Sequence, residues 1–291
     1  MRELLSRART RVVHTHGYRS DVVHAGVARS AGLALVSTAH GFASTGTRGR
    51  IYEWLQVRSW SRFDAVVAVS QPLMATLERA GVPADRLRFI QNGVIAGVAP
   101  LMSPEAARAR LDLPRGAPVV GWVGRFSEEK DPRLMLRAFA RCADKTSVLC
   151  MVGDGPMAAE CRALAEELEV SDRVSFPGVL PDAAPCFTAF DVLALSSRTE
   201  GTPMVVLEAA QAGVPVVGTA VGGVPALLDG RAGWLVPAGD EAALAAALDV
   251  VIADRDDATR RAAKLGARLG ESTKGEGWVE RYLTLYERVQ R

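Results

Sequence analysis

The fold expected for this chain is decided by two adjacent segments, Asp191-Val-Leu-Ala-Leu-Ser-Ser197 and Glu200-Gly-Thr-Pro-Met-Val-Val-Leu-Glu208. The first is typical of a buried strand that ends in small polar residues. The second contains a Gly/Pro turn that leads into strong helix formers, and Gly213-Val-Pro215 then ends the helix. A strand, a loop and a helix in this order predict one unit of an open α/β sheet.

The second segment carries two carboxylates around a helix start. Glu200 is expected on the loop at the carboxyl end of the strand, where open α/β sheets bind their ligands. The helix is expected to begin near Pro203, so Glu208 lies about one turn inside it and faces the same crevice. The free N–H groups of the helix start favour a phosphate. This combination points to a nucleotide-sugar; two solvated glutamates favoured by the helix dipole are the alternative.

The whole chain alternates short apolar runs with helical stretches, in two series that meet near residues 97–116. Near-continuous apolar strands separated by helices indicate parallel sheets covered on both faces, so we expect two such α/β domains with a cleft between them. Strands are expected at residues 11–14, 33–38, 64–69, 87–90, 118–123, 147–152, 173–176, 191–195, 215–218 and 233–236. Helices are expected near residues 131–143, 156–169, 203–212, 240–253 and 276–291.

The composition is that of an ordinary globular protein, with 48% hydrophobic and 23% charged residues. The net charge is +2, but residues 1–62 hold ten arginines against three acidic residues, which makes a basic surface that attracts anions. No nucleic-acid motif accompanies it, so nucleic acid is not an expected partner. The uncharged run 209–228 contains four glycines and two prolines, which argues against a membrane span. The four cysteines lack metal-ligand spacing and are expected to be reduced core residues.

Two further loops carry groups suited to phosphates and planar ligands. Gly124-Arg-Phe-Ser-Glu-Glu-Lys130 follows a predicted strand. In this loop the planar guanidinium group of Arg125 and the ammonium group of Lys130 can bind a phosphate. A surface ion pair between Lys130 and a neighbouring glutamate is the alternative. Gly153-Asp154 also ends a strand, and its glycine allows a planar ligand to approach the backbone. Residues 176–180 are expected to follow the next strand in the same way.

All four histidines lie in the first forty residues. His14 and His16 share one face of a strand, but no Cys, Asp or Glu cluster accompanies them, so we expect no metal site. His40 follows a predicted strand and is expected in the cleft. His16 either has a similar position or is simply a hydrogen-bonded residue at the end of a strand. Residues 48–62 mix arginine with aromatic residues; we expect this segment to pack against the first sheet, with a membrane-surface helix as the alternative.

Together these motifs resemble glycosyltransferase family 4, the retaining nucleotide-sugar transferases of the GT-B fold. The resemblance covers essentially the whole chain. It rests on an ordered series: Ser37-Thr-Ala-His40-Gly41, Ala65-Val-Val-Ala-Val-Ser70, Ile90-Gln-Asn-Gly-Val94, Val123 to Lys130, Val152-Gly-Asp-Gly-Pro156, Phe176-Pro-Gly178, Glu200 with Glu208, and Ala212-Gly-Val-Pro-Val-Val217. It implies two Rossmann-like doubly wound α/β domains facing a cleft: an incomplete acceptor-side domain over 1–100, a nucleotide-sugar domain over 101–275, and a C-terminal helix over 276–291 that crosses back.

The resemblance also implies roles for individual residues. Arg125 and Lys130 would hold the diphosphate and stabilise it as leaving group, and Glu200 and His40 would lie by the donor sugar. Glu208 would bind the ribose. The remaining candidate substrate-binding residues line the distal phosphate, the base pocket and the loops around them: Gly201, Thr202, Met204, Val205, Gly124, Gly153, Asp154, Val179 and His16. No metal and no cofactor are expected, because charge on the diphosphate is met by Arg125, Lys130 and a helix start.

The expected function is therefore transfer of a sugar from a nucleotide-diphosphate sugar to a glycan, a lipid-linked glycan or a small molecule. A non-catalytic nucleotide-sugar-binding remnant is the alternative. The expected location is cytoplasmic, with peripheral contact at the inner membrane face left open. The first series of strands is short for a doubly wound domain, and the family's opening Gly-rich loop has no counterpart. We therefore expect the chain to be the later part of a longer enzyme that binds nucleotide but turns over little.

Overall fold

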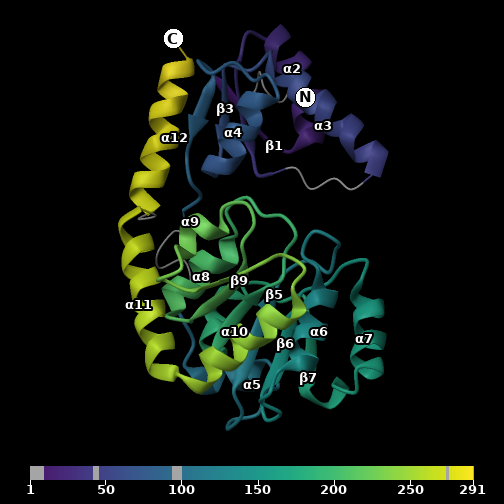
Figure 1. Cartoon of the computed structure of the whole chain (residues 1–291). Coiled ribbons are helices and arrows are strands. Elements are labelled where there is room, and N and C mark those ends of the chain that lie inside the picture. Colours follow the sequence, from purple (N-terminus) through teal and green to yellow (C-terminus); the bar gives the residue numbers. More distant parts are fainter. Residues whose placement is uncertain (1–9, 42–45, 94–99, 273–274, 291) are drawn as a thin grey trace. The chain divides into compact units, whose positions relative to one another are not determined.

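The computed structural model describes residues 10–41, 46–93, 100–272 and 275–290. By its internal contacts the chain divides into two compact units, Met1–Gly93 with Thr273–Arg291, and Val94–Ser272. Each unit holds one parallel β-sheet and the helices that cover it (Figure 1). This is the α/β class expected from the sequence, with a smaller sheet in the N-terminal unit. Val94 and the Gly/Pro-rich connection that follows it lie outside the described residues.

The larger unit contains a six-stranded parallel sheet in the order β10-β9-β8-β5-β6-β7. Its strands are β5 (Val119–Val123), β6 (Val148–Val152), β7 (Val174–Gly178), β8 (Val192–Leu195), β9 (Val216–Thr219) and β10 (Trp234–Val236). From β5 the chain moves outward through β6 to β7, and then returns to the other side of β5 to build β8, β9 and β10. The strand order therefore reverses between β5 and β8, which is the position where doubly wound sheets bind ligands.

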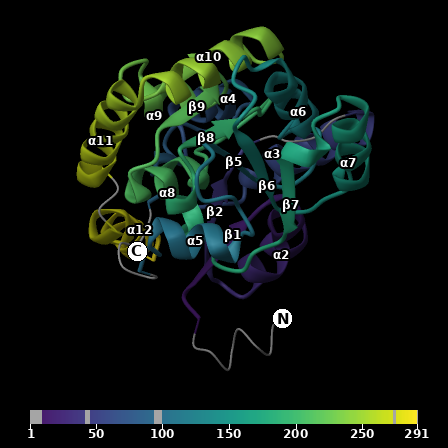
Figure 2. The same ribbon diagram turned by 90° about the horizontal axis from the view of Figure 1, so that it is seen from below.

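Helices cover both faces of this sheet (Figure 2). They are α5 (Pro104–Arg110), α6 (Pro132–Arg141), α7 (Ala158–Glu167), α8 (Met204–Ala212), α9 (Val224–Leu228), α10 (Glu241–Ala253) and α11 (Arg255–Ser272), with 3₁₀ turns at Ser171–Arg173 and Ala184–Ala189. Buried side chains of α6, α7 and α10 form one core cluster with the sheet, and those of α5, α8, α9 and α11 form a second on the opposite face. The strands are apolar on both faces because both are covered.

Two features of the larger unit differ from the sequence expectation. The highly charged helix α11 was not expected. Its apolar contacts come from Ala258, Ala262, Leu265 and Leu269, which are buried at helical spacing among exposed polar residues. The segment from Phe176 to Gly178 belongs to β7 instead of following it. Because β7 is the edge strand, its Pro177 removes no hydrogen bond from the sheet interior.

The smaller unit contains a four-stranded parallel sheet in the order β1-β2-β3-β4. Side chains of α2, α3 and α4 share a core cluster with one face of the sheet, and α12 packs on the other face against Val36, Ala65 and Val67. The elements are β1 (Val12–His16), α2 (Tyr18–Ser30), β2 (Ala34–Ala39), α3 (Gly46–Trp60), β3 (Ala65–Ala68), α4 (Gln71–Arg79), β4 (Leu87–Phe89) and α12 (Gly275–Val289). Every strand here neighbours the next one in sequence, so the described strands contain no reversal of order.

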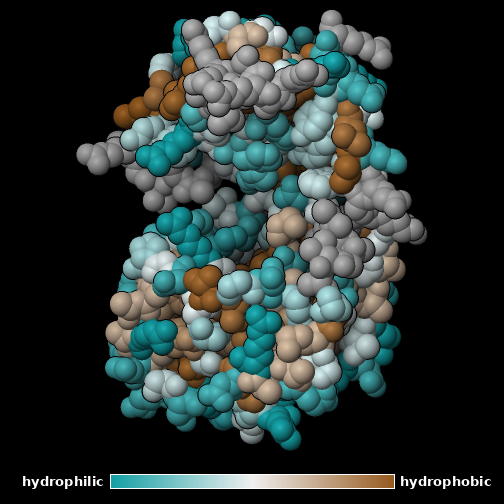
Figure 3. Space-filling model, turned by 180° about the vertical axis from the view of Figure 1, so that it is seen from behind, coloured by the Kyte–Doolittle hydropathy of each residue, from teal (hydrophilic) through white to brown (hydrophobic). Residues whose placement is uncertain are grey.

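Helix α3 packs on the sheet through one face only. Trp60 and Gln56 are buried, whereas Ile51, Tyr52 and Trp54 are exposed. The expectation that this segment packs against the first sheet is confirmed for the buried face, while the exposed face keeps its aromatic and aliphatic side chains in solvent. None of the helices in the described ranges is long and apolar enough to cross a membrane. Hydrophilic and hydrophobic side chains are interspersed over the face of the larger unit seen in Figure 3.

The four cysteines are free thiols and all are buried, as expected from the sequence. Burial raises the pKa of Cys142 and of Cys150 to about 12 and that of Cys161 to about 11. These side chains therefore behave as small apolar core residues.

A fully buried carboxylate ties together the elements of the smaller unit. Asp21 on α2 accepts hydrogen bonds at Oδ1 from Thr15 Oγ1 (2.5 Å) and Ser37 Oγ (3.0 Å). At Oδ2 it accepts from Gln56 Nε2 (2.7 Å) and Trp60 Nε1 (3.1 Å). The four donors come from β1, β2 and α3. Both oxygens are thus satisfied, as a buried carboxylate requires.

Replacing Asp21 with asparagine should destabilise the chain by about 2–4 kcal/mol. An amide nitrogen in place of either carboxylate oxygen would face two hydrogen-bond donors, since each oxygen accepts two bonds. Urea unfolding measures the loss. Glu78→Gln on the exposed face of α4 is the control and should change stability by less than about 0.5 kcal/mol. Equal losses in the two variants would contradict a structural role for this carboxylate.

Candidate functional site

Two loops meet at the carboxyl ends of β5 and β8 in the larger unit, where the strand order reverses. The loop after β5 runs from Gly124 to Asp131, and the loop after β8 runs from Ser196 to Pro203. The backbone N–H of Arg198 donates to the carbonyl of Glu129 at 2.8 Å. The hydroxyl of Ser196 donates to the carbonyl of Lys130, also at 2.8 Å. The two loops are therefore joined at Lys130 by one backbone hydrogen bond and one bond from a side-chain hydroxyl.

Lys130 and Glu200 form an ion pair across these loops, with Nζ and Oε1 2.6 Å apart. The hydroxyl of Ser197 donates to the same oxygen at 2.7 Å, and Thr219 Oγ1 donates to the carbonyl of Ser197 at 2.7 Å. The side chain of Glu200 is only 6% exposed and that of Lys130 is 29% exposed. The surface pair with a neighbouring glutamate is therefore not the one observed, because Lys130 pairs with a buried carboxylate seventy positions away in sequence.

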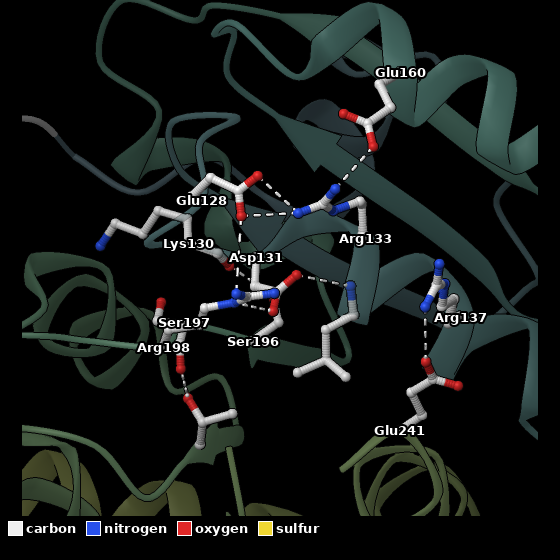
Figure 4. A network of polar contacts seen from close by, with 12 residues as sticks. Glu128, Lys130, Asp131, Arg133, Arg137, Glu160, Ser196, Ser197, Arg198 and Glu241 are labelled. Carbon is white, nitrogen blue, oxygen red and sulfur yellow. Dashed lines mark hydrogen bonds and ion pairs between the residues drawn. The ribbon is translucent and has the colours of Figure 1, made fainter. Parts of the chain in front are cut away.

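A network beside Lys130 holds the loop in shape, and the sequence patterns did not single out its residues. Arg198 Nε donates to Asp131 Oδ2 at 2.6 Å (Figure 4). Asp131 is buried, has a left-handed backbone with φ of 44°, and caps α6 by accepting from the N–H of Leu134. Glu128 pairs with Arg133, which also reaches Glu160. The sequence feature that could have indicated this network is the polar run Ser196-Ser197-Arg198, which directly follows an apolar strand.

The loops after β5, β6 and β7 lie against one another at the same end of the sheet. Gly124 donates its backbone N–H to Val152, and Gly153 donates to Gly178. A Cβ on Gly153 would overlap the carbonyl oxygen of Gly124, and the positive φ of 131° is a second reason for glycine there. Asp154 follows, and its carbonyl accepts from the N–H of Phe126. Val179, which directly follows β7, is 68% exposed.

Arg125 is the second residue of the first loop, and it is exposed. Within the part of the chain that the structure describes, its guanidinium makes no hydrogen bond and no ion pair. In a protein with 31 arginines, most of those near this site are engaged with acidic partners. Arg125 therefore keeps its planar set of donors available to an anion.

Helix α8 begins directly after the loop that carries Glu200. Its N-cap residue is Pro203, which offers no side-chain hydrogen bond to the first turn, so the N–H groups of Met204 and Val205 are free of a side-chain cap. Gly201 accepts a backbone hydrogen bond from Gly223, and Thr202 is buried. Uncapped N–H groups and the helix dipole together favour an anion at this position.

Glu208 lies on α8, one turn into the helix, as expected from the sequence. Its side chain is half-buried, and no described residue donates a hydrogen bond to it. Burial raises the pKa of its carboxyl group above the usual value. A half-buried carboxylate without a donor costs folding free energy, so Glu208 is poised to accept hydrogen bonds from a ligand.

His16 and His40 come together in the smaller unit, at the ends of β1 and β2. Their Nδ1 and Nε2 atoms are 3.0 Å apart and hydrogen-bonded. Burial is the main reason that the pKa of His40 is lowered, and the neighbouring His16 lowers it further. The nearby Asp21 raises the pKa of His40 and so opposes these two causes. The histidine pair belongs to the smaller unit and the Lys130–Glu200 pair to the larger unit.

Within the described ranges, no group of three or more His, Cys, Asp or Glu side chains is arranged to hold a metal ion. Both ring nitrogens of His14 are hydrogen-bonded to hydroxyl groups. Of the three neighbouring imidazoles, only those of His16 and His40 therefore keep a free nitrogen.

Replacing Glu208 with glutamine should stabilise the ligand-free chain at neutral pH. The pKa of Glu208 is higher in the folded chain than in the unfolded chain. At a pH above the folded-state pKa, the ionised carboxylate therefore destabilises the fold. At a pH below the unfolded-state pKa, the carboxyl group is protonated in both states and this destabilisation is absent. We expect Tm to rise by roughly 1–3 °C at pH 7, with no gain below the ordinary pKa of 4.5. Glu167→Gln, on the surface of α7, is the control. The same gain at both pH values would contradict this explanation.

Two family profiles match the chain. The profile "Glycosyltransferase Family 4" matches residues 1–96, in the smaller unit and the start of the connection, and "Glycosyl transferases group 1" matches residues 117–254 of the larger unit. The 2-deoxystreptamine N-acetyl-D-glucosaminyltransferase of Streptomyces fradiae is 38% identical over 185 residues, 60% of this chain and 44% of that protein. The lipopolysaccharide core biosynthesis glycosyltransferase LpsE of Rhizobium meliloti is 36% identical over 179 residues, 61% of this chain and 52% of that protein. The chain spans about half the length of the curated relatives it matches.

Solved structures match over nearly the whole chain. Sucrose-phosphate synthase from Thermosynechococcus elongatus has a TM-score of 0.87 and 25% identity, and the match covers 99% of this chain and 75% of that one. Anabaena HepE in complex with UDP and glucose has a TM-score of 0.89 and 24% identity, covering 98% and 80%. The two family profiles occupy the two units in order, and the structural neighbours share both sheets. The chain belongs to glycosyltransferase family 4 and has the GT-B fold.

Proposed function

We propose that this chain transfers a sugar, with retention of configuration, from a nucleotide-diphosphate sugar to a hydroxyl-bearing acceptor. The observation that carries the proposal is the joining of Lys130 and Glu200 beside the uncapped start of α8, at the reversal of strand order. A cation, free N–H groups and two carboxylates within one loop cluster match a ligand that has both phosphates and sugar hydroxyls. The sugar, the acceptor and the linkage stay open.

The diphosphate would be bound by positive groups that reach it from two loops. Arg125 is free to bind phosphate oxygens in bidentate fashion, and the N–H groups of Met204 and Val205 would meet the distal phosphate. Lys130 would exchange its bond to Glu200 for a phosphate oxygen. Negative charge grows on the diphosphate as the sugar leaves, so the cations stabilise the transition state more than the bound donor.

The two glutamates would bind hydroxyl groups of the donor. Once Lys130 turns to the phosphate, Glu200 keeps the hydrogen bond from Ser197 and has acceptor capacity for the sugar. Glu208 has no donor among the described residues and would accept from the ribose hydroxyls. Gly153, Asp154 and the exposed Val179 would contact the base, since the glycine backbone admits a planar ring.

The smaller unit would supply His40, assisted by His16, on the side of the donor sugar. UDP is the first nucleotide to test, since Anabaena HepE was solved with UDP and with UDP-glucose. The similar proteins carry names for different acceptors, lipopolysaccharide core in one and inositol 3-phosphate in another. We therefore propose a UDP-sugar as donor and leave the acceptor class to a screen of glycans, lipid-linked glycans and polyols.

Substitution of Glu208 and of Lys130 should separate binding from turnover. Glu208→Ala should weaken UDP binding by about 1.5–3 kcal/mol, roughly 10–150-fold in Kd, because charged hydrogen bonds to the ribose are lost. Lys130→Ala should mainly lower kcat, by about 10²-fold, because its partner charge grows in the transition state. Titration calorimetry with UDP, followed by measurement of UDP release from UDP-sugars in an acceptor screen, gives the two quantities.

Exposed residues of the same types serve as controls. Glu167→Ala on α7 and Lys264→Ala on α11 lie on the surface of the larger unit and should bind UDP and release it like the unchanged chain. If Glu208→Ala and Lys130→Ala affect neither affinity nor turnover, the proposed donor site is wrong. Tight UDP binding without turnover of any donor would favour the binding-protein alternative over an enzyme.

We also propose that transfer needs no divalent metal, because Arg125, Lys130 and the start of α8 meet the diphosphate charge. Sugar transfer should then keep most of its rate in excess EDTA, and added Mg²⁺ or Mn²⁺ should raise it less than about twofold. Thermal unfolding with and without EDTA checks that the chelator leaves the fold unchanged. Loss of transfer in EDTA that is reversed by Mn²⁺ would refute this part of the proposal.

A further inference from the structure

Three imidazole rings lie in a row at the ends of β1 and β2 in the smaller unit. His14 and His16 are on one face of β1, and their ring centroids are 4.4 Å apart. The ring of His16 stacks on that of His40, with centroids 5.3 Å apart and an angle of 21° between the planes, and the two rings share the hydrogen bond described above. The position of His40 is thus linked through His16 to that of His14.

His14 is in turn held by hydroxyl groups of α12 and β2. Its Nδ1 is hydrogen-bonded to the hydroxyl of Tyr286 at 2.7 Å, and its Nε2 to Thr38 Oγ1 at 2.8 Å. The hydroxyl of Tyr282 is hydrogen-bonded to the same Thr38 oxygen at 3.0 Å. A neutral imidazole has one donor and one acceptor, and each hydroxyl has one proton. When His14 is neutral, all three hydrogen bonds can therefore be made at once, with every donor pointing the same way along the series from Tyr286 to Tyr282 or every donor pointing the opposite way.

The packing of α12 fixes the two tyrosines. They are four residues apart, so both project from one face of the helix. Tyr282 is 8% exposed, and with Leu285 it packs against Val36 and Val67 of the sheet. The hydroxyl groups are therefore presented to His14 and Thr38 by a helix that is docked on the sheet.

Burial keeps His14 and the two tyrosines uncharged near neutral pH. Burial lowers the pKa of His14 to about 4, and His16 and His40 act in the same direction. Burial raises the pKa of both tyrosines; for Tyr282 the hydrogen bond to Thr38 opposes the rise, and Tyr286 adds to it. Between these limits His14 stays neutral and both phenols keep their protons, so the hydrogen bonds persist over the range in which enzymes of metabolism operate.

We propose that Tyr282 and Tyr286 are positioning residues for the transfer reaction. They hold His14 in one orientation, His14 supports His16, and His16 orients His40 and sets which of its ring nitrogens carries the proton. The proposal rests on the proposed function only in placing His40 beside the donor sugar. The network itself is a property of the smaller unit and is measurable without donor or acceptor.

The test uses the small number of histidines and tyrosines in this chain, four of each. NMR of the imidazole rings in the 291-residue chain follows the titration of every histidine, and His24 on α2 is an internal reference. In Tyr286→Phe, with Tyr282→Phe as a second variant, the titration midpoints of His16 and His40 should move by roughly 0.3–1 pH unit, and that of His24 should not. Tyr52→Phe is the matched control, because Tyr52 is an exposed tyrosine of α3 that stacks on Tyr18.

Activity provides the second readout. In the tyrosine variants kcat should fall about 3–10-fold and its pH dependence should move with the His16 and His40 midpoints, whereas the Kd of UDP, bound by the other unit, should not change. Unchanged His16 and His40 titrations in two folded variants would overturn the inference, even if the chain transfers sugar. Shifted titrations in a chain that transfers no sugar would refute the proposed function and leave only the hydrogen-bonded network.

Discussion

The structure of the candidate donor site depends on one constraint, the reversal of strand order between β5 and β8. Connections that leave these neighbouring strands run in opposite directions, so their loops diverge above the sheet and leave room that side chains can line. Lys130 comes from one loop and Glu200 from the other, and hydrogen bonds from Ser196 and Arg198 to backbone carbonyls join the two loops. Two further groups proposed to bind the donor, Arg125 and Glu208, follow the same two strands.

Much of the fold around the candidate donor site was predictable from the sequence, because these elements depend on local sequence patterns. The apolar run from Asp191 and the Gly/Pro turn after Glu200 gave a strand, a loop and a helix start that the structure places within one or two residues. The position of Glu208 followed from helical geometry alone. By contrast, α11 has few apolar residues, and its narrow stripe of alanine and leucine is recognisable only once the surface of α8 and α9 that it covers is known.

The contacts of the site were not predictable in the same way, because they join residues far apart in sequence. Nothing local pairs Lys130 with a carboxylate seventy positions later, or directs Arg198 to a buried Asp131 with a left-handed backbone. For α12 the sequence predicted a helix over 276–291 but no role for its tyrosines. Their hydroxyl groups acquire a role when the helix docks on a sheet built more than two hundred residues earlier.

The buried thiols have a practical consequence. Cys142, Cys150 and Cys161 have pKa values of about 11 to 12, so almost none of their thiolate form exists at neutral pH, and Cys186 is equally inaccessible. A cysteine introduced on the surface would therefore react with a maleimide dye far faster than any of the native ones. The chain accepts site-specific fluorophores or spin labels, one on each unit, without prior removal of its own cysteines.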